Sequence, residues 1–369
     1  MSEIHSIVMP KLGLTMQEGL LADWIVAEGD EISAGQHILD IETSKIANSY
    51  ESPFSGKLHR IVGEVGGTYP VGSLLGVIAD AATPAAAVDS FVEEFLANFK
   101  PVEAGADAAP SPETATVDGQ RMRYLRMGEG EADAVLLIHG FGSDHGTWIL
   151  NHGALAEGRQ VVAVDLPGHG GSTKDVGGTG VSALADRVVS LSKTLGPTRF
   201  HVVGHSLGAA VAAHVADKLG ASAASLTLIA PVGISADVSA DFLDGFLREQ
   251  RSRKLRPYLE MLSADPSMIS VEMVEDVLKA KRVDGAQAAL TAIREANLPG
   301  GRQSVDIRDI IAAAAYPVQV ILGDRDQILP SNGTADLPPS VKRTVIAGSG
   351  HVPYLEKANE VNALIQEML

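Results

Sequence analysis

From about residue 118 to the C-terminus, continuous apolar runs alternate with stretches in which apolar residues recur at helical spacing. Strands buried on both faces produce such runs, so the pattern predicts a largely parallel sheet covered by helices on either side. The segment 235–312 interrupts this rhythm because it is helical and amphipathic without a strand run. We interpret it as a helical cap over an active site. The predicted strands lie at residues 134–138, 161–164, 200–203, 226–229, 318–322 and 344–346, and the predicted helices at about 181–195, 207–219 and 352–368.

The first 82 residues show a different pattern, in which short alternating segments are separated by glycines and one arrangement occurs twice. Gly29, Gly35, Ile38 and Ile41 recur, at one constant offset, as Gly66, Gly72, Leu75 and Ile78. This repeat predicts a small all-β domain of short strands and tight turns. Lys45 lies between the two copies, where a hairpin tip would present it to solvent. It is therefore a candidate for carrying a covalently attached swinging group, the alternative being an ordinary solvated turn lysine.

Residues 83–117 are rich in Ala, Pro, Glu and Asp, a composition that predicts a flexible acidic linker. Within it, the apolar spacing over 88–99 predicts a short amphipathic helix that Pro101 ends. A helix of this length is not stable alone, so it must dock on another surface. We expect that surface to be the globular domain at 118–369, with a partner subunit as the alternative.

Composition and charge exclude several classes of protein. The chain has no cysteine, so disulfides, thiolate zinc sites and a cysteine nucleophile are excluded, as fits a cytosolic protein. The net charge of −17 argues against nucleic-acid binding through a general basic field. The N-terminus lacks the pattern of a signal peptide, and charged residues interrupt the apolar stretch 207–234, so we expect no membrane span and a cytoplasmic location.

The segment Gly204–Gly208 reads Gly-His-Ser-Leu-Gly and stands between a predicted strand and a predicted helix. The motif G-x-S-x-G places its serine on a sharp strand-to-helix turn, where a side chain at either flanking position would clash with neighbouring backbone. The motif alone is weak evidence, and the strand before it and the helix after it are the context that supports it. Ser206 is thus a candidate nucleophile.

Three further loops follow predicted strands in the order that such a site requires. The loop 139–142 stands where an oxyanion-hole loop belongs, Asp326 follows the strand 318–322, and His351 follows the strand 344–346. Asp324 is the alternative acid. No spacing of ligands indicates a metal site, and neither a phosphate-binding loop nor a dinucleotide fingerprint is present.

These motifs support two family resemblances. Residues 9–16, 28–30, 42–45 and 71–73 resemble those of a lipoyl domain, a flattened all-β barrel, although Ser44 stands where that family usually has an aspartate before the modified lysine. Residues 118–369 resemble the α/β-hydrolase family. The resemblances imply lipoic acid on Lys45, Ser206 as nucleophile, His351 as base and Asp326 as its orienting acid. The backbone N–H groups of Phe141 and Leu207 would form the oxyanion hole.

A lipoyl domain fused to an α/β-hydrolase resembles the acetyltransferase components of bacterial acetoin dehydrogenase complexes, over nearly the whole chain. This resemblance implies acetyl transfer from dihydrolipoyl-lysine to coenzyme A. It also implies a thiamine-diphosphate-dependent acetoin-cleaving subunit and a dihydrolipoamide dehydrogenase as partners, and a homo-oligomer remains open. The alternative is a serine ester or thioester hydrolase with an attached lipoyl domain, because the triad does not itself distinguish a thiol acceptor from water.

Overall fold

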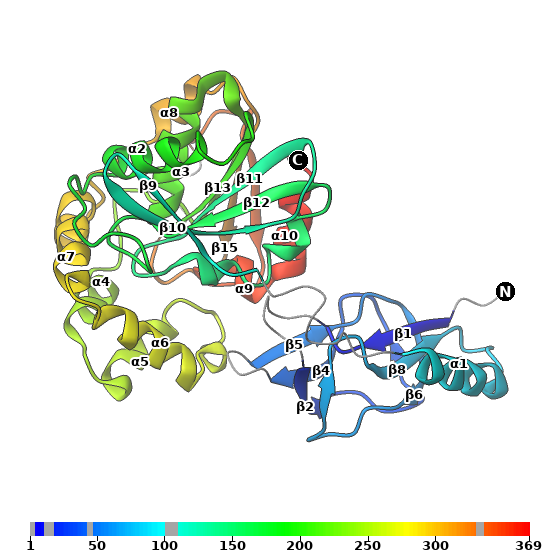
Figure 1. Ribbon diagram of the computed structural model, residues 1–369. Helices are drawn as coiled ribbons and strands as arrows, with labels where there is room; N and C mark the ends of the chain where they lie inside the picture. Colours follow the sequence, from blue (N-terminus) through cyan, green and yellow to red (C-terminus); the bar gives the residue numbers. More distant parts are fainter. Residues whose placement is uncertain (1–3, 11–17, 43–46, 100–109, 330–335) are drawn as a thin grey trace. The chain divides into compact units, whose positions relative to one another are not determined.

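The computed structural model describes residues 4–10, 18–42, 47–99, 110–329 and 336–369. The chain divides into two compact units, Met1–Ala109 and Pro110–Leu369 (Figure 1). Each unit has its own hydrophobic core. Among the described residues, no helix combines the length and apolar character that crossing a bilayer requires.

The N-terminal unit consists of two small antiparallel sheets packed around the apolar residues of the repeat. One sheet has the order β1-β8-β6-β3 and the other β5-β4-β2-β7. Ile38, Ile41, Leu75 and Ile78 are fully buried between them, because alternating positions of each strand face inward. The strands are β1 Ile4–Val8, β2 Glu18–Trp24, β3 Glu31–Ile32, β4 His37–Glu42, β5 Ala47–Glu51, β6 Gly56–Ile61, β7 Thr68–Pro70 and β8 Leu74–Ala79.

The predicted amphipathic helix is present as α1 (Ala85–Asn98), but it docks on neither of the two surfaces that we expected. Its buried Val88 packs with Leu74 and Val77 of β8, and Phe91 and Phe95 lie against the same cluster. The outer side of β8 is apolar and would otherwise be exposed, so α1 completes the N-terminal unit. The predicted linker from residue 83 is therefore wrong at its start.

The second unit is built on an eight-stranded sheet with the order β16-β15-β14-β13-β11-β12-β10-β9. The strands from β11 to β16 pair in parallel, whereas β9 and β10 pair antiparallel at one edge. The strands are β9 Glu113–Val117, β10 Gln120–Met127, β11 Ala132–Ile138, β12 Arg159–Val164, β13 Phe200–His205, β14 Ala223–Ile229, β15 Val318–Gly323 and β16 Lys342–Ile346. Because β9 begins at Glu113, the linker predicted to run to residue 117 also ends too late.

Helices cover both faces of this sheet, as the apolar runs predict. Adjacent residues of a strand face opposite cores, so that Leu136 packs in one cluster and Leu137 in the other. The helices α2 (Val181–Ser192), α3 (Leu207–Leu219) and α8 (Arg308–Ala313) lie on one side, and α9 (Pro353–Glu356) and α10 (Ala358–Gln366) on the other (Figure 1).

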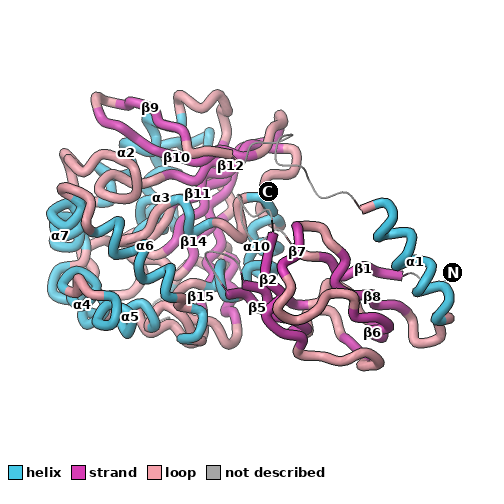
Figure 2. The backbone as a smooth tube through the Cα atoms, turned by 60° about the horizontal axis from the view of Figure 1, so that its bottom comes forward, coloured by secondary structure: helices cyan, strands magenta, loops and turns pink. Residues whose placement is uncertain are grey.

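The helical cap lies between β14 and β15. Four helices form a group at one end of the sheet, α4 (Ala240–Arg248), α5 (Ser252–Glu260), α6 (Val271–Lys281) and α7 (Ala286–Asn297) (Figure 2). The helix α8 falls inside the predicted cap range 235–312 but packs against α3. The cap is therefore smaller than predicted.

Candidate active site

Ser206 occupies the sharp turn between β13 and α3. Its backbone has φ 55° and ψ −120°, a conformation that costs a residue with a side chain on the order of 1–3 kcal/mol. The two glycines of the motif make this turn possible. A Cβ atom on Gly204 would lie 2.3 Å from the carbonyl oxygen of Gly208, and one on Gly208 would lie 2.1 Å from that of His139. The turn therefore holds the serine at the start of α3, as the motif predicts.

The loops after β15 and β16 bring Asp326 and His351 to this serine. His351 Nε2 lies 3.0 Å from Ser206 Oγ, and His351 Nδ1 lies 2.8 Å from Asp326 Oδ2. The other carboxylate oxygen of Asp326 accepts hydrogen bonds from two consecutive backbone N–H groups, those of Ile328 at 2.7 Å and Leu329 at 2.9 Å. These contacts fix both the carboxylate and the imidazole ring.

The environment of Asp326 keeps its carboxylate ionised. Burial by itself would raise the pKa of this group, but the charge of His351 and the hydrogen bonds to its ring and to the two backbone N–H groups outweigh burial and lower it. Asp324, the alternative acid, does not contact His351. It accepts hydrogen bonds from the N–H groups of Gly348 and Ser349 and so shapes the loop before the histidine.

The loop after β11 lies directly beside the serine. A Cβ atom on Gly140 would lie 2.9 Å from His205 Nδ1 and 3.1 Å from the Cβ of Ser206, so a larger residue here would displace one of these side chains. His139 supports the loop from below, because its Nδ1–H donates to the Gly140 carbonyl at 2.7 Å and its Nε2 accepts from the N–H of Leu166 at 3.0 Å. In the part of the chain that the structure describes, the backbone N–H groups of Phe141 and Leu207 have no hydrogen-bond partner. Both are free to bind an oxyanion.

The sequence did not predict that a side chain would hydrogen-bond the main-chain carbonyl of His351. His205, the variable residue of the serine motif, is buried, and its Nε2–H donates to the carbonyl oxygen of His351 at 2.8 Å. Burial lowers the pKa of His205 well below its usual value, so the ring is neutral. Its Nδ1 faces the hydroxyl of Tyr354 at 3.5 Å, and that hydroxyl bonds Thr147 at 2.7 Å. The position inside the motif was the one available signal.

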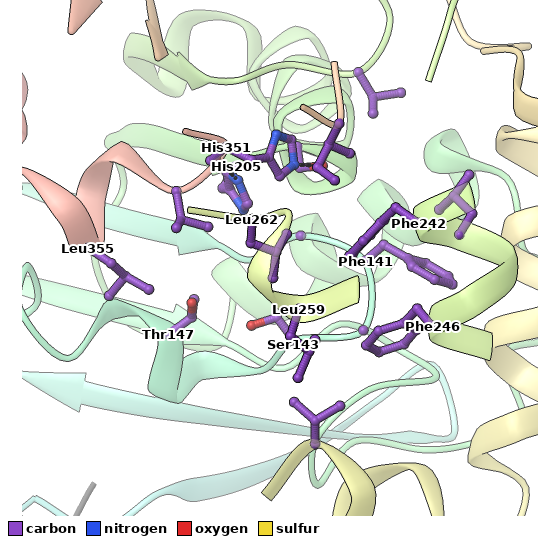
Figure 3. A pocket seen from close by; sticks show the side chains of 18 of the residues that line it. Phe141, Ser143, Thr147, His205, Phe242, Phe246, Leu259, Leu262, His351 and Leu355 are labelled. Carbon is purple, nitrogen blue, oxygen red and sulfur yellow. Dashed lines mark hydrogen bonds between the residues drawn. The ribbon is translucent and has the colours of Figure 1, made fainter. Parts of the chain in front are cut away.

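A cavity of about 150 Å³ lies in front of the serine, between the cap and the loops of the core domain. Figure 3 shows Phe141, Phe242 and Phe246 on one side of it, with Leu259 and Leu262 between them and His351. Apart from the triad end, its lining is almost wholly apolar. The cavity therefore presents a mainly apolar surface to any group held beside Ser206 Oγ.

Lys45 lies outside the described residues, but the strands that flank it are described. The strands β4 and β5 pair antiparallel, and Glu42 lies opposite Ala47 at the end of the ladder. Lys45 belongs to the short connection between these two residues. Such a connection closes a hairpin.

One cluster outside the triad brings possible metal ligands together. Within the described residues, ligand atoms of Asp144, His145 and Asp165 lie within 4.8 Å of one another. Each already has a hydrogen-bond partner. Asp165 Oδ1 accepts from His145 Nδ1 at 2.7 Å, Asp165 Oδ2 accepts from the N–H of Gly171 at 2.7 Å, and Asp144 Oδ1 accepts from the N–H of Gly146 at 2.8 Å. We interpret this cluster as structural.

Comparison with known proteins agrees with both units. Residues 5–78 match the biotin-requiring enzyme family, whose model covers biotinyl and lipoyl domains, and residues 135–364 match the alpha/beta hydrolase family. A meta-cleavage product hydrolase from Pseudomonas fluorescens has the same fold, with a TM-score of 0.63 and 22% identity over 69% of this chain and 96% of that chain. The protein is thus an α/β-hydrolase-fold enzyme with an N-terminal lipoyl-type domain.

Two relatives match along the whole length. The dihydrolipoyllysine-residue acetyltransferase component of the acetoin cleaving system from Cupriavidus necator is 42% identical over 99% of this chain and 97% of its own. The component of the same name from Pseudomonas putida is 39% identical over 100% of this chain and 98% of its own. The chain belongs to this family of acetyltransferase components. The predicted family and fold class are confirmed, and lipoic acid is the covalent cofactor of the N-terminal domain.

Proposed function

We propose that the enzyme transfers an acetyl group from a lipoyl group on Lys45 to coenzyme A through an ester on Ser206. The observation that carries the proposal is the hydrogen-bonded series in which Asp326 contacts His351 at 2.8 Å and His351 contacts Ser206 at 3.0 Å. A serine becomes a nucleophile only when a positioned base takes its proton.

Lys45 fits the attachment of a lipoyl group, because it belongs to the connection of a hairpin whose strands end at Glu42 and Ala47. The exposed side chain of Glu42 supports a solvent-facing end of this hairpin. When attached, the lipoyl group supplies the acetyl group as a thioester.

In the first half-reaction, Ser206 Oγ attacks the thioester carbonyl carbon while His351 Nε2 takes the hydroxyl proton. The free N–H groups of Phe141 and Leu207 would stabilise the oxyanion that forms, and each such donor is typically worth about 10²–10³ in turnover. The carbon–sulfur bond then breaks, and His351 returns the proton to the leaving sulfur. Asp326 holds the ring and stabilises its charged form throughout.

In the second half-reaction, the coenzyme A thiol gives its proton to His351 and its sulfur attacks the ester carbonyl. The Ser206–acyl bond breaks, the serine oxygen recovers the proton, and acetyl-coenzyme A leaves. The apolar lining of the cavity supports this outcome, because it offers few hydrogen-bond partners to a water molecule that would hydrolyse the ester.

We further propose the partners that the resemblance implies, namely a thiamine-diphosphate-dependent acetoin-cleaving subunit and a dihydrolipoamide dehydrogenase. The names of the two full-length relatives, as components of acetoin cleaving systems, support the presence of partner subunits. A cytoplasmic location completes the proposal, and the absence of cysteine from the sequence supports it.

The test is a reaction of the full-length lipoylated chain with acetyl-dihydrolipoamide, with and without coenzyme A. Without the acceptor, intact mass should show one acetyl group on Ser206. With it, acetyl-coenzyme A should form in preference to acetate. Ser206→Ala should abolish both signals while the lipoyl modification remains. Acetate as the main product at saturating coenzyme A would show a hydrolase instead.

A further inference from the structure

The cavity in front of Ser206 is larger than an acetyl group needs. It has a volume of about 150 Å³. An engineered protein cavity of about that size, lined by Leu, Ile and Phe, binds benzene. An acetyl group on Ser206 would place a single methyl group beyond its carbonyl. Most of the cavity would stay empty, and an empty apolar cavity lowers the stability of a protein.

The lining of the cavity suits a hydrocarbon chain. Its cap side is contributed by Phe242 and Phe246 of α4, Leu259 of α5, and Met273 and Val277 of α6. Among the described lining residues there is no Lys, Arg, Asp or Glu. A charged or phosphorylated group would lose its hydration there without a partner, whereas each buried methylene would gain free energy.

The aromatic wall is held in place rather than free to collapse into the space. The Phe246 ring packs edge-on against Phe141 with centroids 5.8 Å apart and contacts Phe242 at 5.9 Å. Behind it, the buried Lys281 donates to the Phe246 carbonyl, and its Nζ lies 5.0 Å from the ring centroid. The backbone and the ring of Phe246 are thus fixed from the far side, and the cavity is preformed.

We propose that this cavity, the acyl pocket, accepts acyl groups of about four to six carbons, so that the enzyme transfers short acyl chains and not acetyl groups alone. The inference rests on the proposed ester at Ser206. The chemistry is unchanged, because the same carbon–sulfur bond breaks, the same Ser206 ester forms and the proton moves through His351 as before. Only the substituent on the carbonyl carbon is longer.

The hydrocarbon of the lipoyl arm is a second source of the same chemistry. The acyl chain is the better occupant, because it stays bonded to Ser206 through both half-reactions. The lipoyl thiol must leave between them and give way to coenzyme A. A preformed cavity beside Ser206 therefore fits the acyl chain, which stays bound there through both half-reactions.

The test compares acetyl, butyryl and hexanoyl thioesters of N-acetylcysteamine, with coenzyme A as acceptor and the full-length chain as enzyme. At about 0.8 kcal/mol per buried methylene, kcat/KM for butyryl transfer should exceed that for acetyl transfer roughly tenfold. A fall in kcat/KM at each added carbon would overturn the proposal. So would a flat series combined with a large preference for acetyl-dihydrolipoamide over acetyl-N-acetylcysteamine, which would assign the cavity to the arm.

Two valines of α6 provide matched variants. Val277 lines the cavity, whereas Val271 is 57% exposed. Val277→Phe should lower the hexanoyl-to-acetyl ratio of kcat/KM by at least tenfold, and Val271→Phe should leave the ratio unchanged. Where Val277→Phe does not fold, Met273→Phe on the same helix serves in its place. Equal ratios in all variants would contradict the proposal.

Intact mass separates this inference from the proposed function. An acetyl adduct on Ser206 without butyryl or hexanoyl adducts would overturn the wider acyl range and leave the mechanism standing. The absence of every adduct, with acyl-coenzyme A still formed, would overturn the serine mechanism itself.

Discussion

The imidazole of His205 is hydrogen-bonded to the main-chain oxygen of His351 at 2.8 Å, and the two rings lie 4.8 Å apart. His205 belongs to the serine turn and also lies beside Gly140, so one buried side chain connects three loops of the site. Its hydrogen bonds go to the His351 carbonyl and the Tyr354 hydroxyl, not to Ser206 Oγ. We therefore regard it as a positioning residue.

Replacing His205 with alanine should lower kcat by about ten- to hundredfold, since misplacement of a catalytic group by about 1 Å can cost 10² in rate. KM for the acyl donor should change less than kcat, because His205 contributes to the triad end of the acyl pocket while the apolar wall from α4, α5 and α6 is unchanged. His205→Gln, whose amide can still donate to the His351 carbonyl, should recover part of the loss. Steady-state kinetics of the three proteins test this.

A second buried histidine of the same strand provides the control. His201 lies in β13 and bonds Ser225 Oγ at 2.8 Å, away from the triad. His201→Ala should lower the melting temperature but not kcat. A similar loss of kcat in both variants would show that His205 acts only through general stability.

Replacing each of the two aspartates after β15 with asparagine in turn should separate their roles. Asp326→Asn should lower kcat about 10⁴-fold, because the amide no longer selects the correct tautomer of His351 or stabilises its charge. Asp324→Asn should keep kcat within tenfold, because within the described residues the Asp324 carboxylate bonds the N–H groups of Gly348 and Ser349 and not His351. The assay is acetyl-coenzyme A formation, with thermal unfolding as the check on folding. The reverse ranking would make Asp324 the triad acid.

Expression in a lipoate-competent host should give a chain with one lipoyl adduct, located on Lys45. Lys45→Ala should lose the adduct, and Lys57→Ala should keep it, since Lys57 lies within β6 and not in a hairpin connection. Peptide mass spectrometry is the measurement. A biotin adduct on Lys45, or a lipoyl group on another lysine, would refute the assignment.

Helix α1 should behave as part of the N-terminal unit. Val88 is 1% exposed and packs against Leu74 and Val77. Val88→Asp should therefore lower the free energy of unfolding of this unit by about 3 kcal/mol or more. Leu96→Asp, at a position that is 52% exposed, should have little effect. Hydrogen exchange of β8 amides measures the difference. Equal protection in both variants would show that α1 does not stabilise this sheet.

Asp165 should make stability depend on acid pH. Burial alone would raise its pKa, but the hydrogen bond and charge of His145 prevail and lower it from 3.8 to about 2. The folded state therefore binds its proton more weakly than the unfolded state does. The resulting stabilisation, about 2 kcal/mol, is complete above pH 4 and is lost as pH falls through 2.

Unfolding by urea at pH 6 and pH 3 tests this dependence. The difference in free energy of unfolding between the native chain and Asp165→Asn should shrink by about 1 kcal/mol at the lower pH, because roughly half of the linkage is lost there. A difference that is the same at both pH values would mean that the Asp165 pKa is not lowered by folding.

The parallel core of the second unit was predictable because strands buried on both faces contain continuous apolar runs, as at residues 134–138 of β11 and 161–164 of β12. The edge strands β9 and β10 were missed, since exposed and buried positions are mixed along them and Arg or Thr occupies five of their 13 positions. The predicted helix 352–368 is interrupted at Lys357, where φ is −133°. That break depends on how the two short helices pack, and residues 354–368 contain no Gly or Pro that would indicate it.

The site shows the same division. Ser206, Asp326 and His351 could be predicted because each follows a strand whose end is fixed by the sheet. The contact of His205 with a main-chain oxygen could not, since any residue at position 351 offers the same carbonyl. The surface on which α1 docks was also hidden, because β8 is apolar on both faces and the sequence does not indicate which element covers the outer one.

The positive φ of Ser206 affects the engineering of more stable variants of this enzyme. Glycine adopts φ 55° without penalty, and the contacts of the serine hydroxyl are few. Selection for thermal stability alone will therefore favour glycine at this position, and the most stable variants of such a library will include inactive ones. Thermal stability and turnover have to be screened together in this fold, because at residue 206 a substitution that raises stability abolishes turnover.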